Sequence, residues 1–472
     1  MQIYRTFSEL LADWSHSSAP ALFFGDPISS ISFSELSDLI RREADKIRSE
    51  KTVRRLIVTD HEVRTVVNII ACAIAGCDTV LADESLNDET LSAITKMVCP
   101  DSIHCSDSEL YEYLCESRPK GRHISALPRH KDGEEGNLIF FTSGTTSQSK
   151  AVVLTPESLL RCTYSGQCML ACYPDDILLS VLPFSHVFGF VCGLLWGLVY
   201  GAAVALGRGS KYLLADCEHF RPTILPAVPS IINILVQRGC LNEELSTVLI
   251  GAAPLTTETM LALGSSGRKI YVGYGLTETS SGLAITQKLS EPNKLYPCPD
   301  VDICIEADGE ISVTTPCMME GYLSFAGKES FTPARGERLY TGDLGFLTRD
   351  GALVLTGRKK DLLILPDGTK IFCTDYEQIL APMIGTDDIA LVLRDHKLVL
   401  IVGGMSSDHY QSIVNVVADF NSMKPQSERI YDVVLQDTPL PRTSAGKLRR
   451  WQVDPENAFS SENEKRQKFL IC

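Results

Sequence analysis

Short apolar runs alternate with helical patterns between residues 177 and 272, and this alternation limits the possible folds more than any other feature of the chain. Strands that alternate with helices form a mainly parallel sheet with helices on both faces. We therefore expect an α/β fold here, with strands at Ile177–Leu182, Ala202–Leu206, Thr223–Ala227, Val248–Ile250 and Lys269–Val272.

The preceding segments repeat the pattern less clearly. Strands are predicted at Leu56–Thr59 and Thr79–Ala82, and helices at Val63–Ala75 and Leu86–Met97. The polar stretch from Cys105 to Gly136 is predicted to be a loop-rich connection.

The last third of the chain has a different sequence pattern. After residue 289, β segments alternate with glycine turns, which predicts an antiparallel or barrel-like subdomain with strands at Val301–Ile305, Glu310–Thr314 and Gly351–Leu355. The full chain of 472 residues exceeds the usual limit of one hydrophobic core. We therefore expect two or three domains.

One uncharged segment, Val187–Leu206, is long enough to cross a bilayer. Its glycines recur at every fourth position, as in close-packed membrane helices. However, no basic cluster flanks the segment, and it lies inside the strand–helix alternation. We expect a buried core helix, with a membrane helix as the alternative.

The net charge and the pattern of cysteines indicate which partners and which cellular compartment to expect. A formal net charge of −15 argues against nucleic acid, because phosphate backbones require basic surface. The 16 cysteines show no C-x-x-C and no zinc-like spacing, so reduced thiols are expected. The N-terminus lacks a signal-peptide pattern, and we expect a cytoplasmic protein without a transmembrane segment.

A glycine flanked by hydroxyl residues follows the predicted buried strand Leu138–Phe141. Residues Thr142–Thr146, with Lys150 soon after, offer backbone N–H groups, hydroxyls and one ammonium to phosphate oxygens. A helix is predicted to begin at Pro156. The segment is interpreted as a phosphate-binding loop, with a polar surface loop as the alternative.

Six further motifs follow in order. Small residues after one strand allow a planar ring to approach the backbone, and an aromatic, a hydroxyl and a carboxylate follow another strand. Open α/β sheets bind ligands at the carboxyl ends of their strands. The motifs are Pro183–His186, Gly251–Leu255, Tyr271–Thr279, Tyr340–Asp343, Gly357–Asp361 and Pro441–Lys447.

From about residue 135 to about 450, this set of motifs resembles the superfamily of adenylate-forming enzymes, which includes acyl-CoA synthetases, peptide-synthetase adenylation domains and luciferases. The resemblance implies a large N-terminal domain, 1–359, of two helix-covered, mainly parallel sheets plus a β-barrel-like subdomain. It also implies a small, mobile α+β C-terminal domain, 360–472, with Lys360 at the hinge.

The resemblance also implies roles for individual residues. The phosphate loop would hold the β- and γ-phosphates of ATP, small residues would bound the adenine, and an aspartate with an arginine would hold the ribose. Catalytic roles fall to Lys447, Thr277 at the α-phosphate, Glu278 as the Mg²⁺ ligand, and His186 near the acid or acceptor. The implied ATP-binding residues are Thr142, Ser143, Gly144, Thr145, Thr146, Lys150, Gly251, Ala252, Ala253, Tyr274, Gly275, Asp343 and Arg358.

The implied reaction activates a carboxylic acid to acyl-AMP with release of pyrophosphate, then transfers it to the thiol of coenzyme A. Ser185–Phe190 contains no carboxylate to pair a substrate amine, so a fatty acid is predicted, with an aryl or O-succinylbenzoate-type acid as the alternative. His186 is interpreted as a gate, or alternatively as a core histidine. A catalytically silent nucleotide-binding homologue is a more distant alternative.

The acceptor stays open between coenzyme A and the phosphopantetheine of an acyl carrier protein. Coenzyme A is favoured, because an acidic carrier would be repelled by an acidic partner unless a basic patch compensates. The cations expected near the thiol tunnel are Lys359, Lys360, Lys370, Arg442, Arg449 and Arg450.

Some positions depart from the family pattern. Ser147, Ser149 and Ala151 replace glycine or proline around the phosphate loop, which predicts altered loop flexibility rather than lost binding. Cys373 stands where proline is usual in the loop of the thioester half-site.

Overall fold

The computed structural model describes residues 2–119, 126–141, 150–251, 259, 263–264, 267–288, 290–325, 329–334, 336–442, 448 and 450–453, without the side chains of Lys150, Ser210 and Trp451. The chain forms two compact units. The first comprises Met1–Ile305, Ser312–Thr341 and Leu347–Val354, and the second comprises Glu306–Ile311, Gly342–Phe346 and Leu355–Cys472. The domain boundary at 359/360 stays a prediction.

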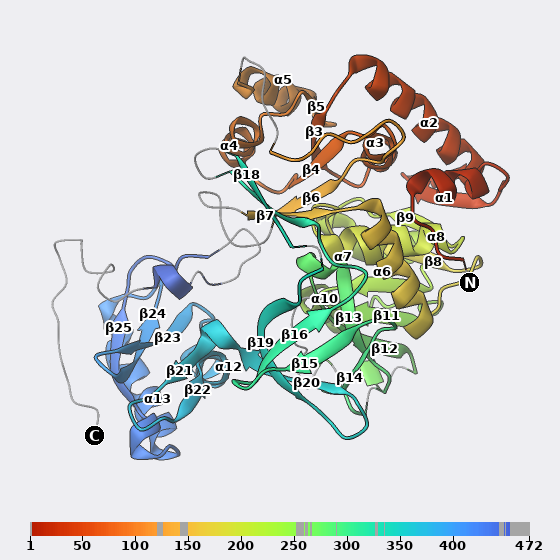
Figure 1. The fold of residues 1–472 in the computed structure, drawn as a ribbon. Helices are drawn as coiled ribbons and strands as arrows, with labels where there is room; N and C mark the ends of the chain where they lie inside the picture. The colour runs from red at the N-terminus through yellow and green to blue at the C-terminus, as the bar shows by residue number, and fades with distance from the viewer. Residues whose placement is uncertain are drawn as a thin grey trace. The chain divides into compact units, whose positions relative to one another are not determined.

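One sheet of the first unit is mixed. Its order is β18-β17-β7-β6-β4-β3-β5, and β5, β3, β4 and β6 are parallel (Figure 1). The strands are β3 (Arg54–Thr59), β4 (Asp78–Asp83), β5 (Ser102–His104), β6 (Leu138–Phe141), β7 (Lys150–Leu154), β17 (Gly321–Ser324) and β18 (Ser330–Pro333).

Helices cover both faces of this sheet. Ile57 of β3 packs in a core with α2 (Phe33–Glu50) and α3 (Val63–Ile74), while its neighbours Leu56 and Val58 pack on the opposite face. That face is covered by α4 (Asp88–Val98) and α5 (Ser108–Ser117). The alternation follows from the two-residue period of a strand.

Helix α5 corrects the expectation that residues 105–136 are loop-rich. The Asp107 carboxylate caps it by accepting from the Leu110 N–H at 2.8 Å. Only Leu114 of this short helix is buried, and Leu110 and Cys115 pack partly against the same core. The helix lies within a polar and charged stretch, which is why the sequence indicated a loop.

The other sheet carries the five strands predicted between residues 177 and 272. Among the described residues its order is β15-β16-β19-β20-β14-β13-β12-β11-β10-β8-β9-β1-β2, with parallel pairing from β12 through β11, β10, β8 and β9 to β1. The strands not yet placed are β1 (Pro20–Phe24), β2 (Ser29–Ser32), β8 (Ile177–Ser180), β9 (Ala203–Leu206), β10 (Ile224–Ala227), β11 (Thr247–Ile250), β12 (Lys269–Leu276), β13 (Ser281–Thr286), β14 (Leu295–Pro297), β15 (Asp302–Ile305), β16 (Glu310–Thr314), β19 (Leu339–Leu347) and β20 (Leu353–Arg358).

The largest core cluster draws side chains from both sheets, including Phe140 of β6 and Val204 of β9. The helices α1 (Phe7–Trp14) and α6 (Pro156–Met169) contribute to it. Helices α9 (Leu213–Phe220) and α10 (Pro229–Arg238) pack in a separate cluster with strands of the second sheet. The α/β fold class is confirmed.

The uncharged segment is part of the core. It forms α7 (Val187–Phe190), a π-helical turn (Val191–Leu195), α8 (Trp196–Val199) and then β9. A Cβ on Gly189 would lie 2.3 Å from the Pro183 carbonyl oxygen, so only glycine allows the start of this helix to pack there. Within the described ranges, no helix has both the length and the apolar content to span a membrane.

The second unit contains an α+β core. Strands β23 (Ile389–Arg394) and β24 (Lys397–Val402) are antiparallel, and β25 (Ile430–Leu435) is parallel to β24. Helices α12 (Cys373–Ile384) and α13 (Tyr410–Ser422) pack through the rings of Tyr376 and Phe420, 5.0 Å apart. A small hairpin, β21 (Leu362–Ile364) and β22 (Lys370–Phe372), precedes α12.

Cys373, the unusual residue noted in the sequence, begins α12. Its thiol donates to the Asp361 carbonyl oxygen at 2.8 Å, and burial raises its pKa to about 11. Because thiolate is the reactive form, this cysteine is a packing residue of the unit rather than a nucleophile.

Candidate functional site

The carboxyl end of β12 positions the central motif of the site. Up to Val272, β12 pairs with parallel β11; from Gly273 onward it pairs with antiparallel β13. A Cβ on Gly275 would lie 1.4 Å from the Ser281 carbonyl oxygen, so glycine is required where the two strands cross closely. Tyr274, beside it, is 9% exposed.

The strand ends in a 3₁₀ turn, Thr277–Thr279, which holds both predicted catalytic residues of this motif. The turn is fixed at each end. The Leu276 N–H donates to the Thr279 hydroxyl at 3.2 Å, and the Ser280 hydroxyl donates to the Cys317 carbonyl oxygen at 2.9 Å. Thr277 and Glu278 therefore lie on a braced backbone, half-buried at the strand's end.

The carboxylate of Glu278 is oriented by a residue that the sequence analysis missed. The Tyr322 hydroxyl, from β17 of the other sheet, donates to Glu278 Oε1 at 2.9 Å. The Glu278 carbonyl oxygen also accepts from the Met319 N–H at 2.9 Å. Burial, followed by the charge of Glu278, raises the pKa of Tyr322, which keeps this phenol protonated as a donor. No local pattern marks Tyr322 as a partner of Glu278.

Mg²⁺ fits this position by donor chemistry. A carboxylate is a hard oxygen ligand, and Mg²⁺ commonly binds one or two carboxylates together with substrate phosphates rather than a complete protein cage. In the part of the chain that the structure describes, no group of three or more metal-ligating side chains forms such a cage. A site with a single protein carboxylate, Glu278, is therefore what we expect for a metal that binds together with a nucleotide.

Gly251 lies at the end of β11, next to β12 in the sheet. A Cβ there would lie 3.0 Å from Cζ of Phe188, so the aromatic ring of α7 packs directly over the glycine backbone. The structure thus brings the small-residue motif and the uncharged segment together. Ala252 and Ala253 lie outside the described residues.

His186 precedes α7 as its N-terminal cap residue, with its side chain 48% exposed. Its Nε2 lies 3.7 Å from Oδ2 of Asp83, at the end of β4. The alternative of a buried core histidine is therefore wrong, because half of the ring is accessible.

In the second unit, Asp343 and Arg358 are neighbours. Arg358 Nε lies 2.9 Å from Asp343 Oδ1, and the aspartate side chain is 7% exposed. The guanidinium is half-exposed, so it holds the carboxylate in place from the solvent side.

Two carboxylates that the sequence analysis did not single out lie beside this pair in the chain fold. Glu310 Oε1 accepts from the Gly342 N–H at 3.0 Å, next to Asp343. Lys359 Nζ lies 2.7 Å from both Asp308 Oδ2 and Glu310 Oε2. Lys359 is thereby anchored, whereas Lys360, the predicted hinge residue, is exposed in the turn Lys359–Asp361.

The remaining predicted residues lie outside the described residues: Thr142, Ser143, Gly144, Thr145, Thr146, Lys447 and the side chain of Lys150. Their flanks are described. Phe141, the last residue of β6, pairs antiparallel with Ala151 of β7, so the phosphate-loop motif connects two neighbouring strands. The predicted strand Leu138–Phe141 and the helix beginning at Pro156 are confirmed, while β7 was not predicted.

The described chain thus contains a helix-covered α/β unit, in which β12 ends in a braced Thr-Glu turn, and a small α+β unit. The family model described as AMP-binding enzyme matches residues 13–323. The chain belongs to the AMP-binding enzyme family, as its motifs predicted.

Known proteins resemble the chain along most of its length. A 2-succinylbenzoate–CoA ligase of Bacillus pumilus is 25% identical over 91% of this chain and 93% of its own. A 3-[(3aS,4S,7aS)-7a-methyl-1,5-dioxo-octahydro-1H-inden-4-yl]propanoyl:CoA ligase of Mycobacterium tuberculosis is 28% identical over 67% of this chain and 65% of its own. The solved structure of o-succinylbenzoate CoA synthetase from Bacillus subtilis, in complex with its acyl-adenylate intermediate, aligns over 100% of both chains with a TM-score of 0.78 and 19% identity.

Proposed function

We propose that this chain is an AMP-forming acid–CoA ligase: it activates an apolar carboxylic acid with ATP and transfers the acyl group to the thiol of coenzyme A. The main support for this proposal is the position of Glu278 in the turn that ends β12, where its carboxylate accepts a hydrogen bond from Tyr322. Similarity over 91% of the chain to a 2-succinylbenzoate–CoA ligase supports the same reaction class.

In the first step, the acid's carboxylate oxygen attacks the α-phosphorus of ATP and pyrophosphate leaves. Both reactants are anions, so the protein's task is positioning and charge neutralisation. The Thr277 hydroxyl contacts the α-phosphate, Asp343 accepts from the ribose hydroxyls, and Lys447 and Lys150 supply positive charge. Glu278 would hold Mg²⁺, which would supply further positive charge to the phosphates.

In the second step, the thiolate of the acceptor attacks the acyl carbonyl carbon and AMP leaves. The carbonyl becomes a tetrahedral oxyanion and then collapses to the thioester. His186 is half-exposed at the start of α7. We propose that it lies at the edge of the acid pocket and borders the path of the acceptor.

The acid pocket is proposed to be built from α7 and the following turns. These segments carry no charged residue, and Phe188 packs over Gly251. An aromatic wall beside a glycine backbone suits a planar ring, and the similar ligases named above act on ring-bearing acids. We place an aryl acid first. A fatty acid is the second candidate, favoured by the continuous apolar run Val187–Val199.

A panel of acids tests this choice through acid-dependent release of AMP. We expect aryl-propanoic and benzoic acids, or medium- to long-chain fatty acids, to stimulate release, and free α-amino acids to leave it near background. An amino acid needs a carboxylate to pair its ammonium, which Ser185–Phe190 does not contain. Strong stimulation by an α-amino acid contradicts the pocket assignment, and no response to any acid favours the silent homologue.

The acceptor is proposed to be coenzyme A rather than a carrier protein. Three cations of the proposed tunnel flank already have carboxylate partners in the second unit: Lys359 with Asp308, Arg442 with Asp388, and Arg450 with Glu377. An acidic carrier needs an extended unpaired basic patch, whereas the phosphates of coenzyme A need only a few cations.

We expect purified acyl-adenylate to react with free coenzyme A at a kcat/KM at least equal to that with any holo carrier protein. Stopped-flow measurement of thioester formation with both acceptors checks this. A carrier preferred by orders of magnitude reverses the assignment.

The cysteines agree with a reducing compartment. Every cysteine in the described ranges has a free thiol, and eight of these residues are buried packing residues such as Cys72 and Cys162. We propose the cytoplasm as the location, since such thiols stay reduced there.

A further inference from the structure

A second concave site lies at the edge of the first sheet, away from the residues discussed above. It is a cavity of about 700 Å³ bordered by α2, α3, the start of α5 and the edge strand β5. This volume falls in the range of cavities that bind small molecules. None of its lining residues belongs to the proposed ATP or acid site.

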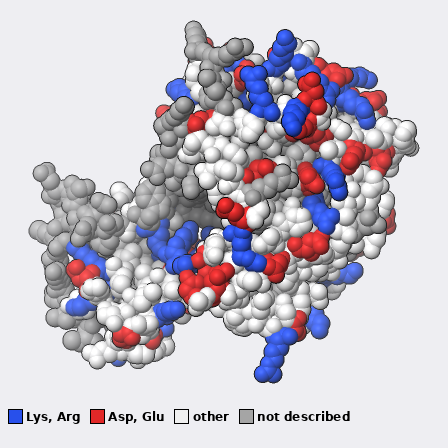
Figure 2. All heavy atoms as spheres, viewed as in Figure 1, with Lys and Arg blue, Asp and Glu red and all other residues white. Residues whose placement is uncertain are grey.

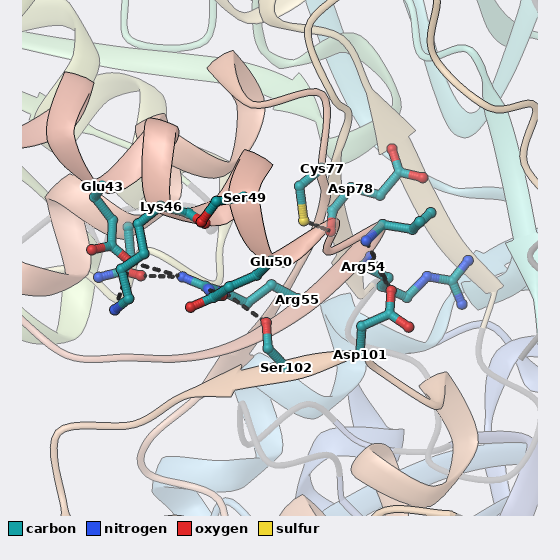
Figure 3. Close-up of polar contacts among 12 residues, drawn as sticks. Glu43, Lys46, Ser49, Glu50, Arg54, Arg55, Cys77, Asp78, Asp101 and Ser102 are labelled. Atoms are coloured by element: carbon teal, nitrogen blue, oxygen red, sulfur yellow. Dashed lines mark hydrogen bonds and ion pairs between the residues drawn. The ribbon is translucent and has the colours of Figure 1, made fainter. Parts of the chain in front are cut away.

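The cavity has a rigid cationic floor, Arg55. Its guanidinium is 6% exposed and donates to Ser102 Oγ at 2.8 Å and to Asn68 Oδ1 at 2.7 Å. Glu43 and Glu50 of α2 each lie 3.2 Å from it. Figure 3 shows Glu43, Lys46 and Glu50 around Arg55, while Arg54, its neighbour on β3, extends away from this group.

The walls carry more positive than negative charge. The lining contains four cations, Arg42, Lys46, Arg55 and Arg64, against the two carboxylates that face Arg55. Lys46 lies 3.7 Å from Glu43, but in the described part of the chain neither Arg42 nor Arg64 forms an ion pair. Arg64 lies in the first turn of α3, where the helix dipole adds to the positive potential.

This local excess of positive charge is unusual for the chain. The net charge is −15, and on the face shown in Figure 2 acidic and basic side chains of the first unit are interspersed. Burial lowers the pKa of His104, another lining residue, so its ring adds no charge at neutral pH. The two exposed arginines are therefore the groups available to an anion.

The rim of the cavity is apolar. Leu39 of α2 and Tyr111 of α5 both line it, and both are exposed, 39% and 42%. Large exposed apolar side chains at the mouth of a charged cavity favour a ligand with a flat or apolar part, since a phenol ring stacks on planar groups.

We propose that this cavity is a binding site for a small phosphorylated compound that carries a planar ring, the chemistry that a nucleotide shares with aryl phosphates. The phosphate binds Arg42 and Arg64 across the mouth, and the ring lies against Tyr111 and Leu39. Arginine suits this role because its planar donors match phosphate oxygens. The site is independent of the proposed ligase reaction.

Isothermal titration of the full chain with phenyl phosphate, inorganic phosphate and phenol tests the proposal. We expect one equivalent of phenyl phosphate to bind at least about ten-fold more tightly than either fragment, because both halves of the site are used. Arg42→Ala and Arg64→Ala should each weaken phenyl phosphate by about ten-fold, the effect of one charge-assisted hydrogen bond.

Arg41→Ala is the matched control. It removes one arginine from the same exposed stretch of α2, and its residue does not line the cavity. It should change affinity by less than about two-fold. Tyr111→Ala should weaken phenyl phosphate but not inorganic phosphate. Equal losses in Arg41→Ala and Arg42→Ala, or no binding of phenyl phosphate to the unmodified chain, overturn the proposal. Unchanged binding in both Arg42→Ala and Arg64→Ala places the probe elsewhere and overturns it too.

Discussion

Glu278→Gln is expected to lower acid-dependent ATP–pyrophosphate exchange by at least about 100-fold, the usual scale for losing one group that stabilises developing charge. The amide is nearly isosteric and its oxygen can still accept from the Tyr322 hydroxyl, which lies 2.9 Å from Glu278 Oε1. The turn should therefore keep its shape. The loss then reports the missing negative charge, because a neutral amide is a much weaker ligand for Mg²⁺.

Tyr322→Phe is the companion variant. It removes the hydrogen bond but leaves the carboxylate charge, so we expect a loss of no more than about ten-fold, the cost of one charge-assisted hydrogen bond. Exchange is measured for both variants at several Mg²⁺ concentrations, and Tyr322→Phe should recover at high Mg²⁺ where Glu278→Gln does not. Near-normal exchange in Glu278→Gln contradicts the assignment of this carboxylate.

Glu329→Ala is expected to destabilise the first unit by about 3–5 kcal/mol, because it leaves a buried guanidinium without its counter-charge. The Arg54 side chain is 2% exposed, and its Nη1 and Nη2 lie 2.7 and 2.9 Å from the two carboxylate oxygens of Glu329. Glu329 Oε1 also accepts from the Ala126 N–H at 2.7 Å. The measurement is the urea unfolding transition that reports the first unit.

Glu291→Ala provides the control for that result. It also removes one carboxylate, but the ion pair of Glu291 with Lys294 is partly exposed, and we expect a change below about 1 kcal/mol. The double variant Arg54→Met with Glu329→Leu should recover most of the lost stability, since a buried ion pair is replaceable by apolar side chains. Equal effects of Glu329→Ala and Glu291→Ala would show that the buried pair contributes no more than a surface pair.

The parts of the fold that sequence patterns predicted are those whose signal is local. The five strands between residues 177 and 272 are short and apolar, so each is recognisable on its own. Pro156, at the first position of α6, is itself a signal for the start of a helix. Helix α5 was not predicted, because it is short and lies within a polar and charged stretch.

The residues of the candidate site also divide into those with a local sequence signal and those without one. The motif order placed Thr277 and Glu278 after a strand, as the structure has them, whereas Asp343 lies in the middle of β19. It could not find Tyr322, which lies 44 residues from Glu278, or the partner of Arg54, which lies 275 residues away. The cavity over Arg55 likewise combines residues from three helices and two strands.

The sequence by itself thus determined the family and the α/β class, and it predicted the nucleotide-site motifs, because those depend on composition and spacing within short segments. Only the tertiary structure decided which residue orients Glu278, which carboxylate neutralises Arg54, and which arginines face an open cavity. These pairings follow from the order of strands in the two sheets, and that order is set by which apolar faces pack together across the whole chain rather than by any neighbouring residues.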